Sequence, residues 1–476
     1  MTNSRHPLPA PRAARHAFKA TVLAGLFALG LNAALARSTF EAPDATYGGT
    51  ITAQPVAGSA IVAGSEITLS GRGFKPGQAI LLSRGGAVLN ADGQPYVADE
   101  QGNFKATFQV PEDAAAGQHP VVVTTSGPSH AAIFALKVSP VVPLSGAAQF
   151  TQASAKLVPG LYQSDISAKT GAIFVTSAVG RPPVKETQLL RLNGQTLVIE
   201  AQRTPAAAPG RNGADGGLYA VYGVGVDDSH GNVWVTNTRQ NTVAVYRQSD
   251  LALVKQFEPG TVNHARDVVV DEALGRAYAS ATGTPNIAVF DAQTLAFTGN
   301  IEIKSTLRGE NFSVASLHLD PAVHKLYAVS LTTNEAAVID AKTGTVEKVF
   351  PVAGAKSAIG VAHDAKTDRL FVASQGSDNL AIVDVASGKT LHLVPTGAGA
   401  LNVTFEPVNR LAYVSNRAAG TVTVVDPDGR VVANLDNGTF PNHVTSDGKG
   451  KVYAINKSRG ADDPVGDRIT RITPVR

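Results

Sequence analysis

One pattern of apolar and polar positions recurs along residues 147–476. A run of five residues with an aromatic side chain second, such as AYVSN at 412–416, leads through a polar turn into another apolar run, TVTVVD at 421–426. Short runs rich in Val, Thr and aromatic residues, bounded by Gly, Asn and Asp, are typical of antiparallel β-strands. We therefore expect a succession of β-hairpins rather than helices.

The phrase occurs seven times, and its period indicates the architecture. Successive aromatic positions lie 60, 44, 49, 44, 42 and 40 residues apart. A period near 40 residues with four strands per unit is typical of a β-propeller blade, because one four-stranded sheet cannot bury both faces without neighbours. The fold expected is all-β, a seven-bladed β-propeller over residues 147–476 preceded by a small β-sandwich. The aromatic positions are Phe174, Trp234, Tyr278, Tyr327, Phe371, Tyr413 and Tyr453.

The last repeat lacks one strand. It stops after RITRI at 468–472, which would be its third strand, and the segment QFTQASAKLV at 149–158 precedes the first repeat without a partner of its own. We expect this segment to pair with the last repeat and to close the ring, since closure removes an exposed sheet edge.

Residues 37–139 have a different sequence pattern. Strand-like runs alternate with turn signals about every ten residues, which indicates a small β-sandwich. The phrases GRGFKPG at 71–77 and DEQGNF at 99–104 resemble bacterial immunoglobulin-like (Ig-like) domains. That resemblance implies a spacer or adhesive module, which could engage a protein or envelope partner. Residues 140–146, PVVPLSG, are expected to form the linker.

The first 36 residues read as a signal peptide. Arg12, Arg15 and Lys19 precede an apolar run at 20–31, and an A-x-A cleavage pattern follows at 34–36. The run is too short for a permanent membrane span, so we expect export to the periplasm by the general secretory route, with release into the medium left open. The chain has no cysteine, which excludes disulfides and thiolate chemistry. A monomer without a membrane span is expected.

Net charge changes once the signal peptide is set aside. The whole chain has 41 basic and 38 acidic residues, and the first 36 residues hold four of the basic ones and no acidic one. The mature chain is therefore close to neutral, and its bulk charge gives no support for nucleic-acid binding.

The repeat resembles a known family. The phrases WVTN at 234–237 and YVSN at 413–416, with the TVTVVD run that follows the second, are similar to the YVTN-repeat β-propellers and to their exported YncE-like branch. The resemblance covers roughly residues 150–476. It implies binding rather than chemistry, and single-stranded DNA as a ligand in the YncE-like branch.

A polar ring is expected where the innermost strands begin. Counting back eleven residues from each aromatic position reaches seven residues at the expected channel mouth, and His264 and His443 flank this ring. The arrangement suits a polar ligand or a hard cation, although water alone could also satisfy it. We expect no metal and no cofactor, because the ring holds a single carboxylate. The seven residues are Gln163, Gly223, Asp267, Ser316, Gly360, Asn402 and Asn442.

The loops on the same side of the propeller carry most of the basic residues, and the turns on the other side carry Asp and Glu. This asymmetry could guide a polyanion, such as single-stranded nucleic acid, to one face even at zero net charge. Ordinary solvated surface charge is the alternative. The loop-face residues predicted to bind are Arg239, Arg266, Arg308, Lys356, Arg417 and Arg459.

Enzyme signatures are absent from the sequence. There is no G-x-S-x-G phrase, no P-loop, and no histidine pair with zinc spacing. The sequence therefore favours an exported, non-catalytic binding protein. The alternative is a hydrolase or lactonase acting at the channel mouth.

Overall fold

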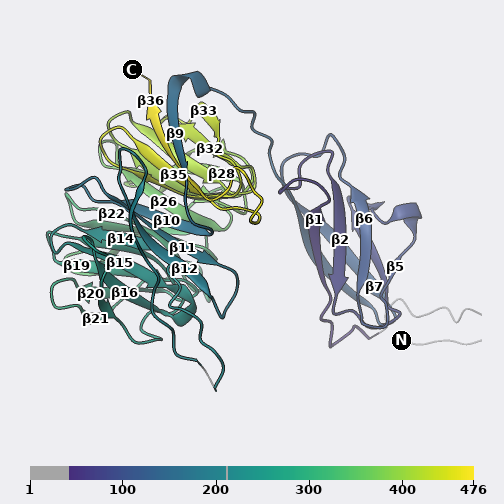
Figure 1. The fold of residues 1–476 in the computed structure, drawn as a ribbon. Helices are drawn as coiled ribbons and strands as arrows, with labels where there is room; N and C mark the ends of the chain where they lie inside the picture. Colours follow the sequence, from purple (N-terminus) through teal and green to yellow (C-terminus); the bar gives the residue numbers. More distant parts are fainter. Residues whose placement is uncertain (1–41, 211–212, 476) are drawn as a thin grey trace, which may run out of the picture.

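The computed structural model describes residues 42–210 and 213–475, which form two β domains (Figure 1). The predicted signal peptide, residues 1–36, lies outside the described residues. Regular helix is confined to three short 3₁₀ turns in the described part of the chain, so the all-β expectation is confirmed. These turns are η1 (Ala91–Gly93), η2 (Ala147–Gln149) and η3 (Thr238–Gln240).

The N-terminal domain consists of two small sheets around one hydrophobic core. One sheet has the order β1-β2-β6 and the other has the order β4-β3-β7-β8, with β5 also paired to β3. Ile67 from the first sheet packs in one cluster with Leu82 and Val123 from the second. Whether this domain belongs to the Ig-like class stays a prediction. The strands are β1 (Thr50–Pro55), β2 (Glu66–Arg72), β3 (Ala79–Arg84), β4 (Ala87–Val88), β5 (Tyr96–Val97), β6 (Phe104–Gln109), β7 (Gly117–Ser126) and β8 (His130–Val138).

After the linker, the described chain folds into seven four-stranded antiparallel sheets, numbered here as blades 1 to 7. Blade 1 contains β10 (Leu161–Ile166), β11 (Ile173–Val179), β12 (Glu186–Leu192) and β13 (Ile199–Arg203). Blade 2 contains β14 (Val224–Asp227), β15 (Asn232–Asn237), β16 (Thr242–Arg247) and β17 (Leu253–Gln256). Blade 3 contains β18 (Ala265–Asp271), β19 (Arg276–Ala281), β20 (Asn286–Asp291) and β21 (Ala296–Glu302).

The remaining blades repeat this plan. Blade 4 contains β22 (Val314–Asp320), β23 (Lys325–Ser330), β24 (Glu335–Asp340) and β25 (Thr345–Pro351). Blade 5 contains β26 (Ala358–Asp364), β27 (Arg369–Ser374), β28 (Asn379–Asp384) and β29 (Lys389–Pro395). Blade 6 contains β30 (Ala400–Glu406), β31 (Leu411–Asn416), β32 (Thr421–Val425) and β33 (Val431–Asp436). Blade 7 contains β34 (Pro441–Ser446), β35 (Val452–Asn456), β36 (Arg468–Pro474) and β9 (Phe150–Lys156).

The blades form a closed ring. The first strand of each blade contacts the first strand of the next, from β10 through β34 and back to β10, so these strands surround the axis (Figure 1). The ring is joined where β9, from before blade 1, pairs antiparallel with β36 from the chain's end, over the register Phe150↔Pro474 to Lys156↔Arg468. This is the pairing that the incomplete last repeat predicts. The molecule beyond the linker is a β-propeller.

The repeated aromatic side chains are core residues. Each lies on the second strand of its blade and is at most 3% exposed. Trp234 shows the packing, because its ring lies 5.5 Å from that of Phe290 in the next blade and 5.9 Å from that of Phe257. These side chains fill the space between blades, so the only tryptophan has no face open to a ligand.

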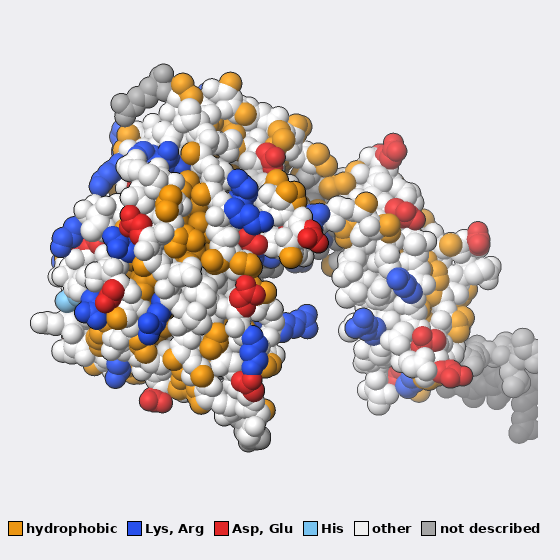
Figure 2. Space-filling model, viewed as in Figure 1, with side chains coloured by type: hydrophobic (Ala, Val, Ile, Leu, Met, Phe, Trp, Pro, Cys, Tyr) orange, Lys and Arg blue, Asp and Glu red, His pale blue; other side chains and the backbone are white. Residues whose placement is uncertain are grey.

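The N-terminal domain contacts the propeller near blades 5 to 7. The linker runs alongside β33. Ser145 pairs with Asn434, and the Asn434 Nδ2 donates to the carbonyl of Val142 at 2.9 Å. Beyond the linker, Lys137 Nζ lies 2.6 Å from Asp378 Oδ1 in the β27–β28 loop. Figure 2 shows the two domains touching near the linker, with open space between them further away. The domains are therefore joined by specific contacts as well as by the chain.

Candidate functional site

The topology places the six predicted basic residues on one face. Each belongs to a loop between the second and third strands of a blade, to a loop that leads into a first strand, or to the start of a first strand, and all three positions share one side of a propeller. We call this side the basic face and the other side the opposite face. Arg239, Arg417 and Arg459 come from blades 2, 6 and 7, whereas Arg308 and Lys356 lead into blades 4 and 5, on the far side of the ring.

Around the axis, the predicted polar ring forms, and its side chains mainly connect blades. Gln163 Nε2 donates to Asp267 Oδ1 at 2.5 Å, and Asp267 Oδ2 accepts the amide of Leu317 in blade 4 at 3.2 Å. Asn402 Oδ1 accepts the amide of Val444 in blade 7 at 3.0 Å. These side chains satisfy backbone amides that no strand partner reaches, so much of their polarity is used in holding the ring together.

The prediction of the polar ring was wrong for one residue, Asn442. In blades 1, 3 and 6 the residue two before the partner of the aromatic position lines the channel, namely Gln163, Asp267 and Asn402, and in blade 7 that residue is His443 rather than Asn442. Tyr453 pairs with Thr445, whereas the equivalent Tyr413 pairs with Thr404, so this connection is one residue shorter in blade 7. Counting a fixed eleven residues back therefore misses the ring by one position.

The other residues predicted at the channel mouth lie in different places. His443 lines the channel, where its Nδ1 accepts the amide of Ser164 at 3.4 Å, and burial lowers its pKa to about 4. His264 is solvent-exposed on the basic face, and partial desolvation of its ring, followed by the nearby charges of Arg239 and Arg266, lowers its pKa. Ser316 is buried, and its hydroxyl makes no hydrogen bond within the described residues.

Asn442 instead lies at the rim of the basic face. Its Oδ1 accepts from Arg417 Nη1 at 2.5 Å and its Nδ2 donates to the carbonyl of Tyr162 at 2.6 Å. It therefore joins blades 6, 7 and 1 and fixes the position of the Arg417 guanidinium.

Three aromatic rings around this rim carry basic side chains on their faces. Lys457 Nζ lies 4.0 Å from the centre of the Tyr162 ring, and Tyr162 packs edge-on against Tyr222 with 4.6 Å between ring centres. The guanidinium carbon of Arg239 lies 5.9 Å from the centre of the Tyr222 ring. Such contacts are attractive because a ring face is electronegative.

The third ring is Phe440, just before β34. The guanidinium carbons of Arg417 and Arg459 lie 5.0 and 5.4 Å from its centre. We call the seven residues the cation–aromatic cluster; its members are Tyr162, Tyr222, Arg239, Arg417, Phe440, Lys457 and Arg459. Sequence reasoning missed Tyr162, Tyr222, Phe440 and the importance of Lys457. The available signal was an aromatic residue just before, or early in, the first strand of a blade.

In the part of the chain that the structure describes, the basic side chains of the cluster form no ion pair, although Asp463 and Asp467 lie in the same β35–β36 loop as Lys457 and Arg459. Within the described residues, no carboxylate lies within ion-pair distance of its four basic side chains, nor of Arg266, Arg308 or Lys356. Ion pairs occur on both faces: Lys185 pairs with Asp215 on the basic face, and Arg369 pairs with Asp428 and Arg430 with Asp426 on the opposite face, the last two at 3.1 and 2.8 Å. The cation–aromatic cluster is thus a group of cations that have no ion-pair partner among the described residues.

Near the axis, burial adds to the energetic cost of these unpaired positive charges. Burial, followed by the nearby charge of Arg417, lowers the pKa of Lys457 to about 7, and burial also lowers the pKa of Arg417. Arg266 Nε is buried without a hydrogen-bond partner among the described residues. Partly desolvated cations that repel one another are stabilised by an anion, so this site has the electrostatics of an anion-binding surface.

A hollow beside the cluster involves the N-terminal domain. Arg459 reaches the hydroxyl of Ser59 in that domain, and a hollow of about 280 Å³ lies between Ser59, Phe440 and Arg417. The N-terminal domain therefore borders the basic face.

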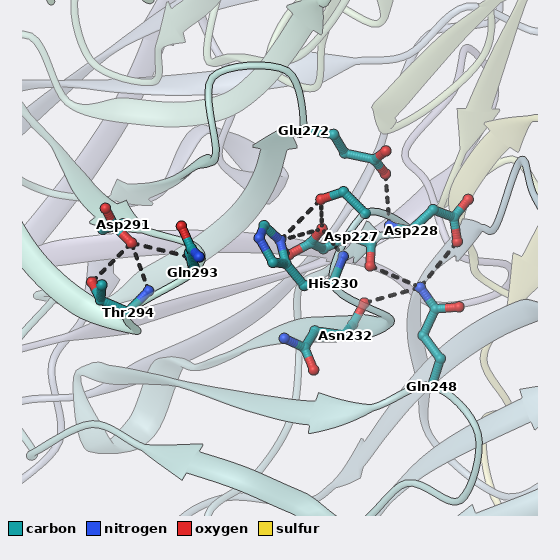
Figure 3. A network of polar contacts seen from close by, with 10 residues as sticks. Asp227, Asp228, His230, Asn232, Gln248, Glu272, Asp291, Gln293 and Thr294 are labelled. Atoms are coloured by element: carbon teal, nitrogen blue, oxygen red, sulfur yellow. Dashed lines mark hydrogen bonds and ion pairs between the residues drawn. The ribbon is translucent and has the colours of Figure 1, made fainter.

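On the opposite face, a network of acidic and amide side chains joins blades 2 and 3 (Figure 3), and Ser167 extends it to blade 1. Asp228 Oδ1 accepts from Gln248 Nε2 at 3.0 Å and from the hydroxyl of Ser167 at 2.6 Å, and Glu272 Oε1 accepts the amide of Asp228 at 2.7 Å. Residues 42–210 and 213–475 include no group of three or more His, Asp and Glu side chains placed to hold a metal ion. In the same ranges, no helix has the length and hydropathy needed to cross a bilayer.

These features define a β-propeller with a cluster of basic and aromatic side chains on one face. No family model matches the chain. Among curated proteins it is 24% identical over 309 residues to YncE of Salmonella typhimurium and of Salmonella typhi, covering 62% of this chain and 82% of either relative. Both are described only as uncharacterized proteins. The propeller is thus YncE-like, with a distant relationship to these two proteins.

Solved structures show the same fold at low identity. Virginiamycin B lyase from Staphylococcus aureus matches with a TM-score of 0.53 and 13% identity, over 68% of this chain and all of the lyase. The U3-55K protein matches with a TM-score of 0.54 and 10% identity, over 69% of this chain and 99% of that one. One neighbour is a lyase and the other is not described as an enzyme, so the likeness concerns the fold alone.

Proposed function

We propose that this protein is an exported, non-catalytic binding protein whose basic face holds an anionic polymer, single-stranded nucleic acid being the candidate ligand. The observation that carries the proposal is the cation–aromatic cluster, in which four basic side chains without acidic partners surround three aromatic rings. Phosphate neutralisation by Lys and Arg and stacking of bases on aromatic rings are the two contacts that bind single strands without sequence preference.

The charge distribution supports a polymer rather than a small ion. Arg308 and Lys356 lie on the same face as the cluster but lead into blades 4 and 5. A chain that crosses the face from the cluster towards these blades would meet basic side chains along its path. The resemblance of the repeat to YncE-like propellers favours the same ligand class.

Fluorescence anisotropy with a labelled 20-nucleotide oligo-dT tests the proposal. We expect binding at about 50 mM salt that weakens steeply as salt is added, because counterions are released from the phosphates. Replacing Arg417 and Lys457 by Gln should weaken binding at least about tenfold and lower the salt slope by roughly one unit per lost contact. The matched control replaces Lys342 and Lys389, on the opposite face, by Gln and should bind as the wild type does.

Competition identifies the ligand class. Heparin and polyphosphate should displace the oligonucleotide if charge alone is recognised, whereas stacking on the aromatic rings should favour oligo-dT over both. Equal losses in the two double variants, or no binding at about 50 mM salt where phosphate contacts are strongest, would contradict the proposal. Lys457 adds a pH signature: since its pKa is about 7, affinity should fall as pH rises from 6.5 to 8.5 and the side chain loses its proton.

A further inference from the structure

The N-terminal domain rests against a loop of the basic face. Residues 375–378 connect β27 to β28, the second and third strands of blade 5, so this loop belongs to the basic face. Gln118 Nε2 donates to the carbonyl of Gly376 at 2.8 Å. Lys137 Nζ, on the adjacent strand β8, donates to the carbonyl of Gln375 at 2.6 Å and pairs with Asp378 Oδ1 at 2.6 Å. The N-terminal domain therefore covers part of the basic face at blade 5.

Two residues predicted to bind the polymer lie at the edge of this contact. The amide of Gly376 donates to the carbonyl of Lys356 at 2.8 Å, and the amide of Lys356 donates to Ser377 Oγ at 3.0 Å, so Lys356 adjoins the covered loop. Arg459, in the β35–β36 loop of blade 7, donates to the Ser59 hydroxyl of the N-terminal domain. A polymer held by both Lys356 and Arg459 would therefore compete with this domain for space.

The N-terminal domain brings no free positive charge to these contacts. The charge of Lys137 is neutralised by Asp378, and Ser59 and Gln118 are neutral. Residues 56–65, the β1–β2 loop that contains Ser59, include no Lys, Arg, Asp or Glu. At these contacts the domain thus occupies space beside the propeller's cations without extending the cationic surface.

The contact between the domains is polar. Within residues 42–210 and 213–475, no hydrophobic cluster combines side chains of both domains. Interfaces of this kind permit relative motion of domains. The linker is attached to β33 through Ser145 and Asn434, and Figure 2 shows open space between the domains further from the linker. The N-terminal domain can therefore move off the face while it remains tethered at blade 6.

We propose that the N-terminal domain is a movable cover of the basic face, which an anionic polymer displaces when it binds beside Lys356 and Arg459. The inference rests on the proposed function, because it concerns access to the same face. The ion pair of Lys137 and Asp378 is the main restraint, since Asp378 is buried and loses this cationic partner when the domain moves. Affinity for the polymer is proportional to the fraction of molecules in which the face is open, so weakening the contact raises the affinity.

Anisotropy with the labelled oligo-dT tests this inference in the whole protein. Lys137→Met removes the ion pair and should tighten binding at least about threefold. The lost positive charge would by itself weaken binding to an anion, so a gain in affinity reports access rather than charge. Lys105→Met removes an exposed lysine of the same domain and is the matched control, which should not tighten binding. Gln118→Ala breaks the other contact with blade 5 and should tighten binding by a smaller factor, which keeps the test informative if Lys137→Met does not fold.

Acetylation of lysines measures the movement directly. With oligo-dT at saturation, mass spectrometry should show Lys137 of the wild type acetylated at least about threefold faster relative to Lys105, because displacement frees its amine from Asp378. Unchanged acetylation, or Lys137→Met and Gln118→Ala chains that bind no more tightly than the wild type, would overturn the cover, while salt-dependent binding in the same titrations would still support the proposed function. Absence of oligo-dT binding by all of these chains at about 50 mM salt would contradict both.

Discussion

Gln163 and Asp267 are joined across the axis of the propeller, with 2.5 Å between Nε2 of the amide and Oδ1 of the carboxylate. They belong to blades 1 and 3, and the equivalent residue of the intervening blade is Gly223. A Cβ at Gly223 would lie 2.1 Å from the carbonyl oxygen of Arg266, so only glycine fits there. The backbones of blades 2 and 3 therefore approach closely beside this contact.

Breaking this contact should cost stability. Gln163→Leu leaves a buried carboxylate oxygen without its donor, which is expected to lower the free energy of unfolding by about 1–3 kcal/mol. Urea denaturation measures the effect. The matched control is Gln152→Leu on an exposed position of β9, which should change stability by less than about 0.5 kcal/mol. Equal effects of the two variants would show that the axial contact contributes no more to the free energy of unfolding than the control position does.

Closure of the ring by β9 should be essential. Deleting residues 147–158 removes the strand that pairs with β36 and exposes a full sheet edge, so the propeller should be strongly destabilised or aggregate. Because Phe150 pairs with Pro474, the same segment attached after the C-terminus through a short turn should pair in the same register. We expect that rearranged chain to regain most of the wild-type melting temperature. A deletion variant that melts like the wild type would contradict the role of β9.

Two channel histidines should make the protein sensitive to acid. Burial lowers the pKa of both His318 and His443 to about 4, below the ordinary value of 6.5, so the native state binds fewer protons than the unfolded state between these limits. Stability is therefore lost as pH falls from about 6.5 to 4, by up to about 3 kcal/mol per histidine. Asp165, with its pKa raised to about 6, has the opposite effect over pH 6 to 4.

Unfolding free energies of variants between pH 7 and 4 separate these contributions. His443→Gln should lose less stability than the wild type over this range, because one acid-sensitive group is gone. Asp165→Asn should lose more, because the stabilising protonation is gone. A flat profile in the wild type would show that the histidines are not held neutral in the native state.

The link between the domains should be measurable. Asp378 is buried and Lys137 is its partner, so Lys137→Met is expected to lower stability by about 1–3 kcal/mol, whereas Lys105→Met on an exposed position of β6 should have little effect. A chain starting at residue 147 should still fold, because β9 and all seven blades are retained. It should, however, be less stable than the same propeller in the whole protein. Identical stability would show that the interdomain contacts contribute nothing.

We also expect the protein to have no hydrolase or lactonase activity at the channel mouth, which is the alternative function. His443 would be its candidate base, but its Nδ1 accepts a backbone amide, and no nucleophile is seen at hydrogen-bond distance from its ring in the described chain. We expect no turnover of p-nitrophenyl acetate or γ-butyrolactone above the rate in buffer. Saturable turnover that His443→Gln abolishes would favour the enzyme instead.

The repeated phrase was sufficient to predict the propeller and its closure. Strand pairing within a blade is local in sequence, and its alternation of apolar and turn residues is visible without any structure. The aromatic position of each repeat lies on the second strand of its blade in the fold, and the incomplete last repeat is completed by β9. The basic loops also share one face, because a fixed strand order determines the face on which each loop emerges.

What the sequence alone could not decide depends on distances between blades. Counting residues placed Asn442 at the axis, but a connection one residue shorter in blade 7 brings His443 there instead. Tyr162 and Lys457 are nearly 300 residues apart and meet only because β9 closes the ring and makes blades 1 and 7 neighbours. Local pattern specifies each sheet, since its hydrogen bonds and apolar faces repeat along the chain. Long-range closure specifies the site, since only the closed ring sets which loops face one another and which charges remain unpaired.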